Sequence, residues 1–137
     1  MLNNGARNTP TRNRNNYTMG LFTDKQRDAL RGYPLYSQDG KKGEAVAVVR
    51  LFITGTAATF YILESNLETG ELFGVSNMEQ GEGWTFGYFS IEELESLDMY
   101  GGTVHAEVDA HFTPAKLKDI PELAEGLAWL WGDDDNS

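Results

Sequence analysis

The feature that most constrains the fold is a continuous apolar run at residues 45–53, which reads AVAVVRLFI. Apolar and β-branched residues fill both alternating faces of this run, and Arg50 is its only polar member. A strand that is apolar on both faces is typical of the middle of a covered sheet. The run is also far shorter than the ~20 residues that a membrane-spanning helix needs. It therefore predicts a buried strand.

Further strand patterns follow this run at short intervals. They cover residues 59–64, 72–78 and 84–89, with turns at Gly55, at residues 66–70 and at residues 79–83. Short connections between successive strands favour antiparallel neighbours, so these segments predict a meander. Residues 103–112 alternate polar and apolar side chains and predict one more strand, which is half-buried.

Short helices are expected around this sheet. Thr23 is a favourable N-cap for a helix at residues 23–31, and Ser90 caps a second helix, where Glu93 completes a capping box. Pro121 opens a last helix that Gly132 ends. The sequence thus predicts an α+β fold, with an antiparallel sheet of four or five strands and short helices on one face and at the ends.

The chain has the length of one domain, and its composition divides it into three parts. Residues 1–18 are rich in Asn, Arg and Thr and predict a disordered basic arm, although Arg7, Arg12 and Arg14 also suit contact with a partner. Residues 19–132 form a single α+β domain, and residues 133–137 an acidic tail. The absence of cysteine excludes the disulfide-rich secreted class, and no segment resembles a signal peptide, so we expect a cytoplasmic protein.

The charge of the chain is strongly negative and unevenly spread. The net charge is −10, and between Glu44 and Phe112 the only Lys or Arg is Arg50. An acidic body repels phosphate backbones and anionic lipid headgroups at short range. We therefore expect no direct nucleic-acid binding by the folded domain and no membrane binding, and we expect a basic protein partner.

Two surfaces are candidates for binding that partner. The first is acidic, and combines the outward face of the helix after Ser90 with the neighbouring turn: Glu79, Glu82, Glu92, Glu93 and Glu95. The second is aromatic and lies on one face of the strand at residues 84–89: Trp84, Phe86 and Tyr88. Aromatic residues are enriched in interface cores, but such a triplet also suits the core of the domain itself.

One strand carries residue types that bind metals. His105, Glu107, Asp109 and His111 alternate with apolar residues and would project from one face. Because side chains two apart on a strand are separated by roughly 6.6 Å, two neighbours at most reach one ion. Further ligands would come from elsewhere, for instance Glu64. The alternative is the plain polar face of a two-faced strand, and we expect neither a metal nor another cofactor.

Several short segments together resemble a known family. They are Leu21-Phe22-Thr23, Arg50-Leu51-Phe52, Thr59-Phe60-Tyr61 with Glu64, Phe73-Gly74, Phe86-Gly87-Tyr88-Phe89-Ser90 followed by Glu93-Leu94-Glu95, and then Glu107, Asp109, Phe112 and Pro114. With these segments, residues 21–120 resemble the bacterial domain-of-unknown-function family 2958. The resemblance implies an origin on a plasmid, an integrative element or a phage, and it assigns no catalytic role to any residue.

Charge and resemblance together suggest a function. We expect a non-enzymatic acidic binding protein of a mobile element, which inhibits or modulates a nucleic-acid-handling or defence protein of the host by protein–protein contact. The alternative is a small metal-assisted enzyme centred on His105, Glu107, Asp109 and His111.

Overall fold

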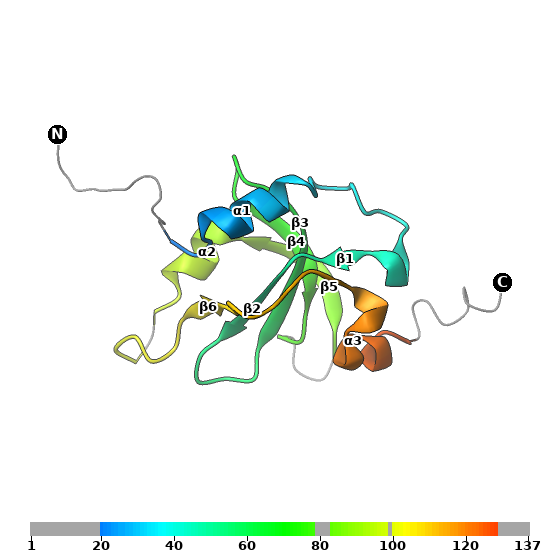
Figure 1. Cartoon of the computed structure of the whole chain (residues 1–137). Coiled ribbons are helices and arrows are strands. Elements are labelled where there is room, and N and C mark those ends of the chain that lie inside the picture. Colours follow the sequence, from blue (N-terminus) through cyan, green and yellow to red (C-terminus); the bar gives the residue numbers. More distant parts are fainter. Residues whose placement is uncertain (1–19, 79–82, 99, 129–137) are drawn as a thin grey trace.

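A computed structural model describes residues 20–78, 83–98 and 100–128 (Figure 1). Its centre is a five-stranded sheet in the order β5-β4-β3-β2-β6. The strands are β2 (Val49–Ile53), β3 (Thr59–Asn66), β4 (Glu71–Ser76), β5 (Thr85–Ser90) and β6 (Ala106–Val108). All neighbouring pairs are antiparallel, which confirms the predicted α+β fold and the meander.

The apolar run at residues 45–53 contributes to two sheets. It divides at Val48 into β1 (Val46–Ala47) and β2, and β1 pairs with β7 (Ala115–Lys116) in a separate two-stranded ladder. The Val48 N–H still donates to the carbonyl oxygen of Ile62 at 2.8 Å, so the division leaves the run attached to β3.

Helical segments cover both faces of the five-stranded sheet. They are α1 (Asp24–Arg31), α2 (Ile91–Ser96) and α3 (Pro121–Gly126), with short 3₁₀ turns η1 (Lys42–Glu44) and η2 (Leu117–Asp119). Figure 1 shows α1 and α2 close together and α3 at the opposite corner of the molecule. The helix expected after Pro121 therefore forms the cover of a second face.

Two core clusters explain this two-sided cover. Leu30 of α1 and Leu94 of α2 pack on one face of the sheet, against Leu51 and Ile62. On the other face, Leu123 of α3 packs in a cluster built from these residues: Ala45, Ala47, Tyr61, Leu63, Val75, Leu117, Ile120 and Leu127. Because β3 is buried on both sides, each face needs its own apolar layer.

The centre of the sheet contains an irregularity between β3 and β4. The register shifts between Ile62 and Glu64, and at this point Gly74 of β4 lies opposite Ile62. A Cβ atom on Gly74 would lie only 2.1 Å from the carbonyl oxygen of Tyr61. Glycine is therefore required at this position, because the two backbones approach more closely than any side chain allows.

Several predicted segments lie outside the described residues. These are the arm at residues 1–18, the turn residues Glu79 and Glu82, the end of the last helix and the acidic tail at residues 133–137. Within the described part of the chain, no helix is long and apolar enough to cross a membrane.

Candidate functional site

Helix α2 presents an acidic surface because its apolar residues face the sheet. The helix begins after Ser90, whose Oγ accepts the Glu93 N–H at 3.2 Å. Ile91 and Leu94 are buried in the first core cluster. The carboxylates on the opposite side are exposed, as predicted: Glu92, Glu93 and Glu95.

Neighbouring elements add further carboxylates around this helix. Three hollows flank α2, and exposed acidic residues from other segments line them together with α2. We call these carboxylates the acidic face, which consists of Glu68, Glu71, Glu92, Glu93, Glu95, Asp98 and Glu107. Arg27 of α1 also lines one of the hollows, beside Glu68 and Glu92. The sequence prediction placed Glu79 and Glu82 on this surface, and both lie outside the described residues.

The largest of these hollows is a groove of about 490 Å³ between α2 and β6. Its lining combines an apolar floor with an acidic rim, and consists of Gly20, Leu21, Leu94, Glu95, Leu97, Asp98, Gly102, His105, Ala106, Glu107 and Val108. Among these described lining residues there is no Lys or Arg. The Glu95 carboxylate also accepts the Leu21 N–H at 2.9 Å, which ties the start of the described chain to the groove.

The aromatic residues of the second candidate surface are divided between the core and the exterior. Trp84 and Phe86 are half-buried and pack against the second core cluster. The ring of Phe86 stacks on Phe73 with centroids 6.0 Å apart. Tyr88, in contrast, has 51% of its surface exposed. Of the three residues, Tyr88 alone offers a largely exposed ring.

The strand predicted at residues 103–112 is much shorter in the structure. Only Ala106–Val108 form β6, because the chain turns directly after it. Asp109 closes this turn: its carbonyl oxygen accepts the Phe112 N–H at 3.2 Å, and its Oδ1 accepts the His111 N–H at 2.9 Å. The expectation of one continuous strand is wrong here, and His111 lies within the turn.

The four candidate metal ligands consequently form separate contacts. His105 Nε2 lies 3.2 Å from Glu107 Oε2, whereas Asp109 pairs with Arg50. Among the described residues, no group of three or more His, Asp or Glu side chains is arranged to hold a metal ion. The hydrogen bond with Glu107, followed by the carbonyl of Gly102, raises the pKa of His105.

Glu64 has a structural role in place of the suggested ligand role. It is 2% exposed, and its two carboxylate oxygens accept the backbone N–H groups of Tyr36 at 2.7 Å and Gln38 at 2.8 Å. The Gln38 side chain in turn donates to the carbonyl oxygens of Val46 and Leu63, both at 2.9 Å. This buried network fixes the loop between α1 and β1 against β3.

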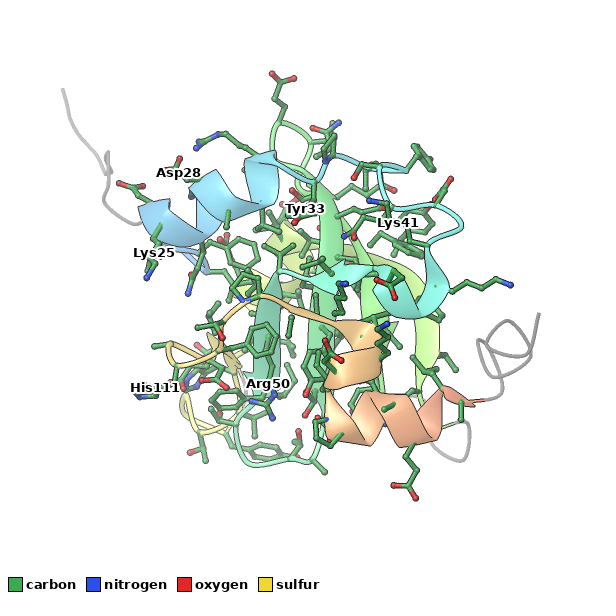
Figure 2. All side chains as sticks on the ribbon, turned by 45° about the vertical axis from the view of Figure 1, so that its right-hand side comes forward. Lys25, Asp28, Tyr33, Lys41, Arg50 and His111 are labelled. Atoms are coloured by element: carbon green, nitrogen blue, oxygen red, sulfur yellow. The ribbon has the colours of Figure 1, made fainter. Side chains whose placement is uncertain are left out.

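Sequence reasoning missed one further polar network, centred on Arg50. Its Nη1 donates to Asp109 Oδ2 at 3.0 Å, and its Nε donates to the Tyr61 hydroxyl at 3.3 Å. The Tyr61 hydroxyl donates in turn to Glu122 of α3. The guanidinium carbon also lies 5.8 Å from the centre of the Tyr61 ring, within cation–π range. In Figure 2, Arg50 and His111 lie in the lower half of the view, below Lys25 and Asp28 of α1.

This network joins β2, β3 and α3 with the turn that follows β6. Burial, and then the hydrogen bond to Glu122, raise the pKa of Tyr61 to about 12, so the phenol is a donor at neutral pH. A signal for the network exists in the sequence, since a lone arginine inside an apolar strand needs a carboxylate partner. The identity of the partners depends on the tertiary fold.

Comparison with known proteins adds one finding. Searches among curated proteins and among solved structures return no match for this chain. A family model described as "Protein of unknown function (DUF2958)" matches residues 21–125. This match spans most of the chain, from Leu21 to α3. It includes the Arg50 network and, apart from Gly20, the residues that line the groove between α2 and β6. The chain therefore belongs to the DUF2958 family.

Proposed function

We propose that this chain is a non-enzymatic acidic binding protein whose partner is a basic, nucleic-acid-handling protein. The observation that supports this proposal is the acidic face, where carboxylates from β4, α2, β6 and the adjoining loops surround three hollows. In the mobile-element setting that the resemblance implies, the partner is a host protein, including one of defence, that the contact inhibits or modulates. The proposal places the chain in the cytoplasm, where such partners act.

The distribution of charge is consistent with this choice of partner. The net charge is −10, and the groove between α2 and β6 is lined by Glu95, Asp98 and Glu107. A surface of one sign steers a partner of the opposite sign and repels competitors of its own sign. A protein that binds phosphate backbones presents a basic surface, so the acidic face would compete with nucleic acid for it.

The alternative of a metal-assisted enzyme lacks a comparable observation. His105 and Glu107 form one pair, and Asp109 belongs to the Arg50 network. The first pair lies along β6, and the second joins the turn after β6 to β2. We therefore propose binding as the function, without a catalytic residue.

The test measures association rates with a partner that is retrieved from host extract and then purified. The variant is Glu92→Lys/Glu93→Lys, which leaves the Glu95–Leu21 contact intact. The matched control is Asp119→Lys/Glu125→Lys, which makes the same charge change at two exposed positions of η2 and α3. Electrostatic steering predicts that the first variant slows association by about tenfold or more and the control by much less, with a steep decrease in rate as salt rises.

Duplex DNA provides the second arm of this experiment. If the acidic face occupies the nucleic-acid surface of the partner, DNA and this chain compete, and saturating DNA abolishes the complex. Equal effects of the two charge-reversal variants, or an association rate that is insensitive to salt, contradict the proposal. Simultaneous binding of DNA and this chain contradicts the choice of partner surface.

A further inference from the structure

Among the residues that the structure describes, strand β6 forms an edge of the five-stranded sheet. In the order β5-β4-β3-β2-β6, its one strand neighbour within the described part of the chain is β2. Edge strands carry a row of backbone N–H and C=O groups that a further strand can pair with. The groove described above runs beside this edge, because four of its lining residues are His105, Ala106, Glu107 and Val108.

The hydrogen-bond pattern identifies which backbone groups face outward. The Thr54 N–H donates to the His105 carbonyl and the Asp109 N–H donates to the Arg50 carbonyl, both at 2.8 Å. In an antiparallel ladder, residues that bond to the neighbour alternate with residues that do not. The backbone N–H and C=O groups of residues 105, 107 and 109 therefore face β2, and those of Ala106 and Val108 point away from β2.

The side chains along this edge have different chemistry on the two faces of the sheet. Ala106 and Val108 lie opposite Ile53 and Leu51 and pack with the first core cluster, beside the apolar floor of the groove. Glu107 lies opposite Phe52 and points to the other face. An added strand would thus meet leucines and the Glu95 and Asp98 carboxylates on one face, and Glu107 on the other.

These charges select the occupant of the edge. A second copy of this chain would bring its own Glu107 to the same edge, and like charges on paired strands are destabilising. Lysine and arginine suit both faces, because their stems cover apolar surface while their charged ends reach a carboxylate. A basic extended segment is therefore the complementary occupant.

We propose that β6 accepts an extended, basic segment of a partner protein as an additional strand, bonded to the backbone of Ala106 and Val108 in the groove beside α2. This inference rests on the proposed function and adds the way in which the partner binds. Main-chain hydrogen bonds provide affinity in such strand addition, and alternate side chains provide specificity.

The test uses the ¹⁵N-labelled full chain and the peptide acetyl-Lys-Val-Lys-Val-Lys-amide. Two modified peptides keep its sequence and charge: one is N-methylated at both valines and the other at the central lysine. Because amides of an added strand face the sheet alternately, one modified peptide should lose most of its affinity and the other should bind like the parent. Amide exchange at Ala106 and Val108 should slow by about tenfold or more in the complex.

A charge substitution completes the design. Glu107→Gln should weaken the parent peptide several-fold, and Glu125→Gln, on α3, should leave its affinity unchanged. Equal affinity of both methylated peptides, or unchanged exchange at Ala106 and Val108, overturns strand addition. So does failure of the parent peptide to bind at several millimolar.

Other occupants of the edge would be visible in the same measurements. Slow amide exchange at Ala106 and Val108 in the free chain would mean that another segment of this chain already occupies the groove. Amide exchange that slows further as the protein concentration rises would mean that a second copy of the chain occupies it. Either result overturns the inference. If the partner's association still depends on Glu92 and Glu93, the proposed function stands without strand addition.

Discussion

Substitution of Gly74 by alanine should destabilise the fold through a contact between two backbones. The new Cβ would lie 2.1 Å from the carbonyl oxygen of Tyr61 and 3.0 Å from the Cα of Ile62. Neither atom can rotate away, so β4 must move by about 1 Å to restore a normal contact distance. Overpacking of this kind costs about 1–3 kcal/mol, and rigid backbone neighbours place Gly74→Ala at the upper end of that range.

The neighbouring strand provides a matched control. Gly87 of β5 lies directly opposite Gly74, and a Cβ there would meet nothing within 4 Å. Gly87→Ala should therefore be neutral, or stabilising by about 0.4–1 kcal/mol through a reduced entropy of the unfolded chain. The two variants thus make the same chemical change at paired positions with opposite expected outcomes.

Thermal and urea unfolding, followed by circular dichroism, measure the difference. At roughly 4 °C per kcal/mol for a domain of this size, Gly74→Ala should melt about 10 °C below the parent chain. The urea midpoint should fall with an unchanged slope, because the unfolded surface is the same. If the two variants melt within about 2 °C of each other, β3 and β4 do not approach as described, and the account of the irregularity at Ile62 is wrong.

Three further outcomes follow from the polar contacts. Glu64→Gln should cost about 1–3 kcal/mol in urea unfolding, because an amide NH₂ would face a backbone donor at a buried site. The pKa of the Glu44 carboxyl, measured by NMR, should be about 2 instead of 4.5, chiefly because of its hydrogen bond to Lys116, and Lys116→Met should raise it. Since the pKa is lower in the folded state, the stabilisation by this carboxylate is complete above pH 4.5 or so and disappears as the pH falls through about 2. The Tyr61 phenol should ionise near pH 12 by absorbance, and Glu122→Gln should lower that pKa while burial keeps it above the usual value.

Local patterns were sufficient to predict most of the sheet. The strands from β2 to β5, the turn at Gly70 and the N-caps at Thr23 and Ser90 depend on residues close in sequence, and the structure contains all of them. Their signals are period-two apolar alternation and capping side chains, which act before any tertiary contact forms. The exposure of the α2 carboxylates followed from the same helical periodicity.

Long-range contacts determine what the sequence did not reveal. Arg50 meets Asp109 across 59 positions, and Tyr61 meets Glu122 across 61, so neither pair has a local signature. The end of β6 has a different cause, because the local turn at Asp109 takes the chain away from β2, which itself continues to Val49. Alternation at residues 103–112 predicted a longer strand, since alternation reports which side chains could share a face and not where the backbone turns.

The contact between Glu64 and the loop between α1 and β1 has an evolutionary consequence. The carboxylate holds this loop by main-chain N–H groups, so its two hydrogen bonds do not depend on which side chains the loop carries. Among the loop side chains, the buried Gln38 is needed, because it donates to the carbonyl oxygens of Val46 and Leu63. Tyr36 is restricted by its φ of 73°, a conformation that asparagine or glycine would also adopt. The exposed positions Ser37, Asp39 and Lys41 carry no such restriction. Substitution at these exposed positions can therefore change the chemistry of the loop while Glu64 and Gln38 keep its path over the sheet.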